Sequence, residues 1–283
     1  MSSKPSFSLG RAVPAAFAFL PAGVGGAFAP LLVLWGLLSF GHAILFHLVH
    51  AGGFLIGGNC NPLVCLGFVL LIVAFKLMAH GALYRSATFG KDARKEGLGP
   101  LGLQFGAPEL RLLATSILVG LFYLVIAGAI FIVFAVIFNL SGLAGDERNT
   151  LKALQTVFCR HQGADWIFIA YAVAAHVFLF FLVVRFSLAH VATVAQKKIV
   201  ALNALGLSSG NVFKLFCGLV LFSAPLVLVM IAVVHHLMPS LPHGAPRLMA
   251  HAGLLAFTIF IIFPLIAGFL SSAYRQIVDL RAK

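Results

Sequence analysis

Long runs of apolar residues, separated by short polar segments, dominate this chain. Six runs are long enough to cross a bilayer, at about residues 27–50, 62–84, 110–138, 165–186, 213–237 and 252–273. Runs of about 18 or more apolar residues are typical of transmembrane helices, whereas a membrane β-barrel has short alternating segments. The pattern predicts an all-α fold, a polytopic membrane helix bundle with six transmembrane helices as three hairpins in a single integral membrane domain, residues 1–283.

The composition supports this class of protein. Hydrophobic residues make up 61% of the 283 residues and charged residues only 9%, whereas a soluble domain has about 25% charged residues. All seven Asp and Glu residues fall at the ends of the spans or in loops. Because proton-coupled transporters usually carry carboxylates inside the membrane, this distribution weakens a transporter function without excluding it.

The basic residues are divided unequally between the two sides of the expected bundle. Fourteen of the 19 Lys and Arg residues lie on the side that holds both termini and the loops after spans two and four, and four lie on the other side. The positive-inside rule then places both termini in the cytoplasm. The net charge of +12 is explained by topology and by attraction to anionic lipid, so no nucleic-acid partner is expected.

The segment before the first span contains Pro14 and Pro21 within an otherwise apolar stretch. One interpretation is a cleavable signal peptide with a cleavage site at Ala27–Ala29, but the prolines interrupt the apolar core of such a peptide. We expect an uncleaved N-terminus in which Phe7–Leu20 forms a short interfacial helix.

Two cytoplasmic turns carry most of the candidate contacts with lipid headgroups or with a partner protein. The basic residues in and beside these turns are Arg85, Lys91, Arg94, Lys95, Arg111, Arg185, Lys197, Lys198 and Lys214. Each turn begins with an Arg at the end of a span and leads through a basic stretch and a Gly to a basic-aliphatic re-entry. This shared layout has two explanations. The chain contains an internal repeat of two helices, or the turns are alike only because every helical hairpin in a membrane needs a basic cytoplasmic turn.

Specific residues mark the helix ends at these turns. The stretch Arg185–Leu205 lacks Pro and Gly, which predicts that the fourth span continues as a helix beyond the bilayer. Ser208, Ser209 and Asn211 offer side-chain oxygens to cap the fifth span. Glu109 suits the positive end of the helix dipole at the start of the third span.

Lys76 is the only Lys or Arg deep within an expected span, and His176 lies at the centre of another. A charge inside the membrane is by default a candidate functional residue, so Lys76 and His176 are candidates for a transport pathway. The alternative for Lys76 is a side chain that extends toward the cytoplasmic interface near Arg85, roughly 13 Å away along the helix.

Histidines and cysteines gather toward the non-cytoplasmic side. Zinc or copper would suit the histidines, and haem would suit His42 with His176, but polar anchoring at the interface explains them as well. We therefore assign no cofactor and no metal site. An oxidising compartment would allow a disulfide between Cys60 and Cys159, while Cys65 and Cys217 are interpreted as small apolar residues at span ends.

The stretch GLGPLG, Gly97–Gly102, matches the glycine pattern of a dinucleotide-binding loop. That loop needs a preceding strand within a parallel sheet, and here a charged helix end precedes it, so the glycines are interpreted as loop residues. The sequence holds no nucleophile elbow, zinc-protease motif or Walker loop, and we expect no enzymatic activity.

The segment Arg185–Leu221 contains an Arg-x-Ser-Leu-Ala span exit, a basic stretch, a Ser-x-Gly-Asn turn and a basic-aromatic re-entry. It resembles uncharacterised bacterial six-helix inner-membrane proteins that are similar to the membrane domain linked to glycerophosphoryl diester phosphodiesterases. Asn203-Ala204 replaces the Trp that usually precedes the turn in that pattern. The resemblance implies a multi-pass protein of the bacterial inner (cytoplasmic) membrane. The given chain carries no phosphodiesterase domain, so that activity is not carried over.

These features together predict a non-enzymatic multi-pass membrane protein that organises or regulates lipid or protein partners. Its expected partners are a phospholipid bilayer with anionic headgroups and another membrane protein. The alternative is a transporter of a small solute, a lipid or a metal, which the positions of Lys76 and His176 favour.

Overall fold

The computed structural model describes residues 7–50, 62–140, 165–242 and 244–282, and every regular element in these ranges is helical. Five helical segments are long and apolar enough to cross a membrane: Leu63–Arg94, Pro100–Phe138, Ile169–Gln196, Val212–Ser240 and Ala245–Asp279. The bent pair Leu9–Gly26 and Phe28–Ile44 makes a sixth candidate. The expected all-α, multi-pass membrane fold is therefore confirmed.

The long elements follow the expected spans closely. They are α2 (Phe28–His50), α3 (Pro62–Phe89), α4 (Ala107–Leu140), α6 (Asp165–Phe186), α9 (Val212–Ala232), α11 (Ala245–Phe257) and α12 (Phe263–Ala282). The π-helical segment η3 (Val233–Leu237) extends α9 into α10 (Met238–Ser240), and the π-helical segment η4 (Thr258–Ile262) joins α11 to α12. Shorter elements form the basic turns: η1 (Gly90–Arg94), η2 (Pro100–Gly102), α7 (Ala189–Gln196) and α8 (Ala204–Ser208).

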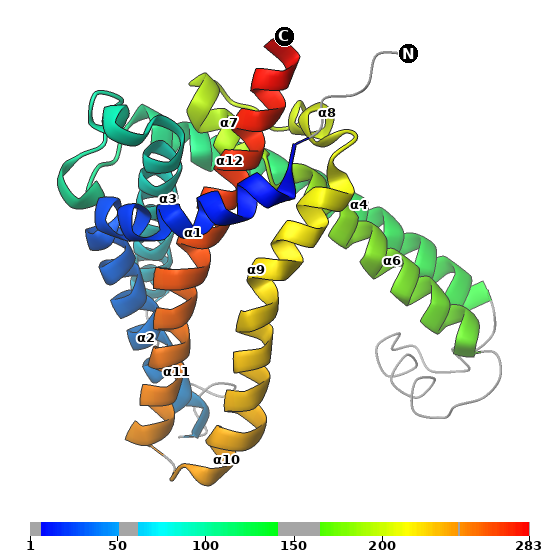
Figure 1. Cartoon of the computed structure of the whole chain (residues 1–283). Coiled ribbons are helices and arrows are strands. Elements are labelled where there is room, and N and C mark those ends of the chain that lie inside the picture. The colour runs from blue at the N-terminus through cyan, green and yellow to red at the C-terminus, as the bar shows by residue number, and fades with distance from the viewer. Residues whose placement is uncertain (1–6, 51–61, 141–164, 243, 283) are drawn as a thin grey trace.

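The helices form a main bundle and a diverging hairpin (Figure 1). In the main bundle, α3 packs against both α2 and α12, and α11 packs against α2. The α4 and α6 helices run together and slant away from this bundle. They meet it at the end where α7, α8 and the C-terminal part of α12 lie.

The first helix, α1 (Leu9–Gly26), lies across this end of the bundle and is bent by 81° from α2 (Figure 1). It packs mainly against α12, where Ala12 and Ala16 are fully buried. Gly268 permits the close approach, because a Cβ atom there would lie 3.1 Å from the Cα of Ala16. The helix corresponds to the one expected over Phe7–Leu20, but it ends later, at Gly26.

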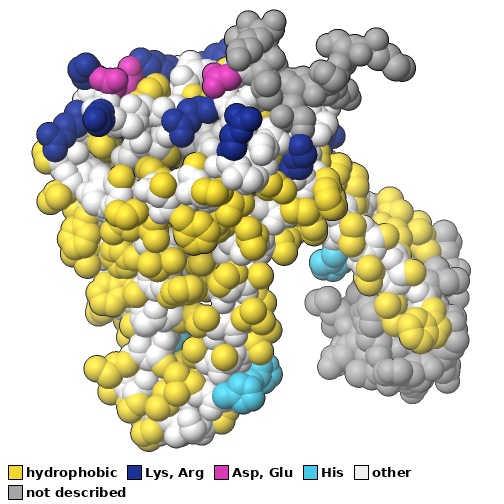
Figure 2. Space-filling model, in the orientation of Figure 1, with side chains coloured by type: hydrophobic (Ala, Val, Ile, Leu, Met, Phe, Trp, Pro, Cys, Tyr) yellow, Lys and Arg dark blue, Asp and Glu magenta, His cyan; other side chains and the backbone are white. Residues whose placement is uncertain are grey.

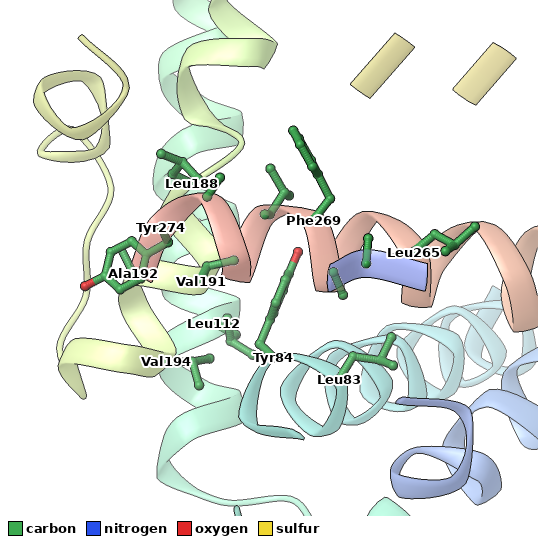
Figure 3. Packing of buried hydrophobic residues seen from close by; sticks show 14 of the residues in the cluster. Leu83, Tyr84, Leu112, Leu188, Val191, Ala192, Val194, Leu265, Phe269 and Tyr274 are labelled. Carbon is green, nitrogen blue, oxygen red and sulfur yellow. The ribbon is translucent and has the colours of Figure 1, made fainter. Parts of the chain in front are cut away.

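The hydrophobic core lies at the same end. Side chains from α3, α4, α12 and the surroundings of α7 converge there, as Figure 3 shows for Leu83, Tyr84, Leu112, Leu188, Val191, Ala192, Val194, Leu265, Phe269 and Tyr274. Burial differs widely between the spans: 44% of the most apolar window of Ala245–Asp279 is buried, compared with 6% for Pro100–Phe138. The last span thus forms the centre of the protein, while α4 exposes its apolar side chains.

The fourth span continues as a helical segment past Arg185 only as far as Gln196, so the prediction of helix through Arg185–Leu205 is wrong in its second half. Helix α6 ends at Phe186, α7 follows after a short turn, and Lys197 adopts the left-handed conformation with φ of 54°. Val191 and Val194 of α7 are buried in the core, which the hydrophobic effect favours.

Asn211 occupies the N-cap position of α9, but its side chain forms no capping hydrogen bond to that helix. Its Oδ1 instead accepts a hydrogen bond from the Phe7 backbone N–H at 3.2 Å. The Nζ of Lys214 donates to the Phe7 carbonyl oxygen at 2.9 Å. The Oε1 of Gln276 accepts from the Ser8 backbone N–H at 2.9 Å. These side chains fasten the start of α1 to α9 and α12.

Candidate functional site

Exposed basic side chains from the two turns gather at the packed end of the bundle. Lys91, Arg94 and Lys95 follow α3, and Lys197 and Lys198 follow α7, and all five side chains are exposed. Figure 2 shows Lys, Arg, Asp and Glu collected at this end, above a broad band of hydrophobic side chains. We refer to these five residues as the basic face.

An ion pair between Glu96 and Lys197 joins the two turns, with 2.6 Å between Oε2 and Nζ. Within the first turn, the Nζ of Lys95 lies 2.8 Å from the Oδ1 of Asp92. Three of the four side chains are exposed and Glu96 is half-buried, so each pair contributes at most about 1 kcal/mol to stability. The pair between the turns matters for position, because it unites two segments that are far apart in the sequence.

The buried hydroxyl of Thr193 holds the second turn in place through three hydrogen bonds. It donates to the carbonyl oxygen of Ala189 at 2.8 Å and lies 2.9 Å from the Oγ1 of Thr115 and 3.1 Å from the backbone nitrogen of Val200. A hydroxyl has one proton to donate, so Thr115 and Val200 act as donors to it. Helices α4 and α7 and the loop before α8 are therefore held together by one side chain.

Exposed apolar side chains accompany the lysines in both turns. Leu101, Leu103 and Phe105 are exposed in the first turn, and Ile199 and Leu202 in the second. Leu101 and Lys197 are also the two non-glycine residues of the described chain with positive φ, 53° and 54°. Basic and apolar side chains side by side are the composition of segments that lie in the headgroup region of a membrane.

Arg85 does not belong to the basic face, which corrects the expected headgroup contact. Its side chain is buried, and its Nη2 forms an ion pair with the Oε1 of Glu109 in the first turn of α4. The Oε2 of Glu109 accepts from the Gly106 backbone N–H at 3.0 Å. A Cβ atom at Gly81 would lie 2.6 Å from the Glu109 carboxylate. Arg85 therefore clamps α3 to the start of α4.

Three other basic residues expected to contact headgroups are half-buried: Arg111, Arg185 and Lys214. The Nη2 of Arg185 donates to the Leu205 carbonyl oxygen at 2.8 Å, and its guanidinium lies 5.8 Å from the centre of the Phe181 ring. Lys214 binds the start of α1, as described above. Arg185 and Lys214 thus have a structural task in addition to any contact with lipid.

A cavity of about 670 Å³ lies where α3, α4, α7, α9 and α12 converge with the end of α6. Most of its lining is apolar and includes Val73, Leu77, Leu112, Leu219 and Leu270. The polar residues of the lining are Lys76, His80, Tyr84, Ser116, Tyr123, Ser187 and His190. Figure 3 shows two lining residues, Tyr84 and Leu112, beside one another, with the Tyr84 ring directed from α3 toward α12.

The two histidines of the cavity are held by hydrogen bonds. The Nδ1–H of His80 donates to the Lys76 carbonyl oxygen at 2.8 Å. The hydroxyl of Ser116 donates to the Leu112 carbonyl oxygen at 2.8 Å, so it accepts the hydrogen bond from the Nε2–H of His190 at 2.9 Å. These bonds fix the orientation of each ring and identify one ring nitrogen of each that carries a proton.

Three other donors of the cavity are unpaired. Within the ranges that the structure describes, no hydrogen bond or ion pair involves the Lys76 ammonium or the hydroxyls of Tyr84 and Tyr123. Lys76 is exposed, whereas Tyr84 is only 5% exposed. Lys76 therefore lies where the cavity opens to the outside of the bundle.

The sequence contained a signal for this cavity beyond Lys76. Lys76, His80 and Tyr84 are spaced four residues apart on α3, which places them along one face of the helix. Ser116, Gly120 and Tyr123 repeat this helical spacing on α4. Polar residues at i, i+4 and i+8 within an apolar span indicate that their side chains share one face and point into the bundle. The sequence analysis considered only Lys76 and not its spacing to His80 and Tyr84.

His176 lies apart from this cavity, on an exposed part of α6, with its Nδ1 2.7 Å from the Ala172 carbonyl oxygen. The expected pathway residues Lys76 and His176 are thus not brought together. His42 of α2 packs on His251 of α11, with 4.2 Å between ring centres, while α6 lies on the other side of the molecule (Figure 1). Among the described residues, no group of three or more His, Cys, Asp or Glu is arranged to hold a metal ion.

The expected disulfide between Cys60 and Cys159 lies outside the described residues. Of the other two cysteines, Cys65 is disulfide-bonded and Cys217 is a free thiol. Cys65 was expected to be a small apolar residue, so that interpretation is corrected.

The glycines of Gly97–Gly102 serve the geometry of the first turn. No strand precedes them, since η1 and the end of α3 occupy that part of the chain. Gly102 has φ of 81°, and a Cβ atom there would lie 2.6 Å from the Gly26 carbonyl oxygen at the bend between α1 and α2. The close approach of two backbones explains this glycine, which the sequence interpretation had identified only as a loop residue.

Comparisons with protein-family models, with curated proteins and with solved structures give no match for this chain. Its class, a multi-pass helical membrane protein, therefore rests on the length and hydropathy of its helices. The resemblance of Arg185–Leu221 to bacterial six-helix inner-membrane proteins stays a prediction.

Proposed function

We propose that this chain is a non-enzymatic multi-pass membrane protein that organises or regulates anionic lipid, or a membrane protein partner, through its basic face. The observation that carries the proposal is the union of two distant turns into one surface by Glu96 and Lys197. That surface combines exposed lysines with exposed apolar side chains such as Phe105 and Leu202. Both kinds of side chain suit the headgroup region of a membrane.

The strength of the expected interaction follows from the number of charges. Each Lys or Arg near an anionic membrane surface contributes about 1 kcal/mol of attraction. Lys91, Arg94 and Lys198 have no ion pair within the described ranges, and Lys95 and Lys197 remain largely exposed beside their acidic partners. The attraction falls with added salt, because exposed charges are screened.

The proposal also includes the orientation of the protein in the membrane. The excess of Lys and Arg on one side favours a cytoplasmic location for the basic face and for both termini. The resemblance of Arg185–Leu221 favours the bacterial inner membrane as the location. Labelling of single cysteines introduced near Lys91 and near Arg247, from either side of intact vesicles, measures this orientation directly.

Lipid selectivity in a reconstituted bilayer tests the basic face. The protein is placed in phosphatidylcholine bilayers that contain a trace of spin-labelled phosphatidylglycerol or spin-labelled phosphatidylcholine, and the motionally restricted fraction of each label is measured. The parent protein is expected to prefer the anionic lipid several-fold, and the variant Lys91→Gln/Arg94→Gln/Lys95→Gln/Lys198→Gln to lose most of this preference. Lys197 is retained because it joins the turns.

A matched control removes the same number of charges from the other side of the protein. It is the variant Arg148→Gln/Lys152→Gln/Arg160→Gln/Arg247→Gln, of which only Arg247 lies within the described residues. This variant is expected to keep most of the selectivity for phosphatidylglycerol. Equal loss in both variants, or no selectivity in the parent, would contradict the proposal.

Transport of a small solute or lipid is a second candidate, and the cavity beside Lys76 favours it. A flux assay in vesicles with the variants Lys76→Leu and His176→Ala tests it. Because His176 lies outside the cavity, only Lys76→Leu is expected to abolish flux. No substrate-dependent flux in the parent protein, or equal loss in both variants, would reject transport through this cavity.

A further inference from the structure

The cavity beside Lys76 is separate from the basic face and has its own chemistry. Lys76 lies near the middle of α3, and its ammonium has no anionic partner among the described residues. None of the residues that line the cavity is Asp or Glu. A lysine at this depth of a membrane is costly unless its charge is compensated. An anion would compensate this charge.

Two hydroxyls add to this requirement. A buried Tyr usually finds a partner for its O–H. Tyr84 is buried and Tyr123 half-buried, yet neither hydroxyl donates to an acceptor within the described part of the chain. His80 and His190 are meanwhile engaged by the Lys76 carbonyl and by Ser116. The cavity thus has three unpaired donors, one of them charged, which match a group with several oxygen acceptors.

The rest of the cavity suits a hydrocarbon chain. Its volume of about 670 Å³ falls within the range of about 300–1,000 Å³ typical of sites for small ligands. Its walls are formed by side chains such as Leu112, Leu219 and Leu270. Lys76 is exposed at the opening, within the apolar length of α3, so a ligand would enter from the bilayer.

We propose that this cavity binds an anionic amphiphile, a molecule with a carboxylate or phosphate head and an acyl chain. The Lys76 ammonium pairs with the head, and the hydroxyls of Tyr84 and Tyr123 donate hydrogen bonds to its oxygens. The acyl chain packs against the leucines of α4, α9 and α12. This binding site is separate from the basic face, so the proposal stands whether or not the basic face selects anionic lipids.

Equilibrium binding to the purified full-length protein in phosphatidylcholine nanodiscs tests the head and the chain separately. The radiolabelled probes are palmitate, a palmitoyl lysophosphatidate, hexadecanol and inorganic phosphate. Palmitate or the lysophosphatidate is expected to bind saturably, at one molecule per protein. Hexadecanol is expected to bind with an affinity at least about tenfold lower than that of palmitate, because it cannot form an ion pair with Lys76. The ratio of the two anions identifies the preferred head.

A pair of glycine variants tests whether the cavity is the site. A Cβ atom at Gly120 or at Gly128 meets no neighbour within 4 Å, so both positions on α4 accept a larger residue, but only Gly120 lines the cavity. Gly120→Phe is expected to reduce anion binding at least tenfold, and Gly128→Phe to leave it unchanged. Both substitutions remove a glycine from a helix interior, which favours folding.

Substitutions of the lysine test the charge. Lys76→Met is expected to reduce palmitate binding about tenfold without changing hexadecanol binding, and Lys76→Arg to restore much of the loss. The proposal would be overturned by equal affinity for palmitate and hexadecanol in the parent, or by full anion binding in Gly120→Phe. These two results remain decisive even if a lysine variant fails to fold.

Discussion

The two basic turns follow the same plan, but they use their first arginine differently. Arg85 at the end of α3 and Arg185 at the end of α6 both turn inward and hold the chain that leads to the next span. Arg85 forms a buried ion pair with Glu109, whereas Arg185 donates to a neutral carbonyl oxygen, that of Leu205, and stacks over a phenylalanine ring. The first turn is thus stabilised by an ion pair between two charged side chains, and the second by a hydrogen bond to a neutral acceptor.

This difference separates two tasks that the positive-inside pattern combines. The arginines at the span exits position the turns, while lysines such as Lys91 and Lys198 further along remain exposed. A basic residue at the end of a span therefore does not by itself identify a headgroup contact. The two turns also predict different responses to substitution, because a buried charge that loses its partner costs far more than a neutral hydrogen bond.

The largest effect is expected at Glu109. Glu109→Gln leaves the Arg85 guanidinium buried without its counter-charge, which should lower the free energy of unfolding by about 3–5 kcal/mol. Denaturation in mixed micelles measures this change. Replacing both partners, Arg85→Leu with Glu109→Leu, should recover most of the loss, because neither charge then remains in the interior. A Glu109→Gln protein as stable as the parent would refute the clamp.

A smaller effect is expected at Arg185. Arg185→Met removes the hydrogen bond to Leu205 and the contact with Phe181, which should lower the free energy of unfolding by about 1–2 kcal/mol. The Leu205 carbonyl oxygen still accepts from the Ser208 hydroxyl at 3.2 Å, which limits the loss. Denaturation under the conditions used for Glu109→Gln gives the comparison. A loss equal to that of Glu109→Gln would remove the distinction between the turns.

The smallest effect is expected between the turns. A double-mutant cycle of Glu96→Gln and Lys197→Met should give a coupling energy of at most about 1 kcal/mol, because both side chains are partly exposed. In about 1 M salt the coupling should vanish. A coupling that persists at high salt would mean that the pair is shielded from solvent, and that the two turns form a more rigid unit than their exposure indicates.

The sequence predicted the spans well because a membrane imposes a simple rule. A run such as 110–138 must be apolar and helical wherever it packs, so hydropathy alone locates α4. The end of the helical segment at Gln196 was missed because the residues of Arg185–Leu205 suit a helix locally. Their burial under α12 and against α4 depends on contacts that no local pattern contains.

The candidate sites were predicted less completely. Lys76 was identified from its position alone, and the spacing of His80 and Tyr84 would have extended the prediction to one face of α3. The direction of Arg85 was not predictable, because its partner, Glu109, lies 24 positions away and suited a simpler role at a helix end. Pairing across a turn depends on how two helices meet.

The hydrogen bond between Ser8 and Gln276 spans 268 positions of the chain. The first helix also packs along α12, which is synthesised after every other helix described above. α1 therefore cannot reach its final place during synthesis until the sixth span has been inserted. Until then the buried face of α1 lacks its main packing partner, so α1 takes its place only after helices that follow it in the chain.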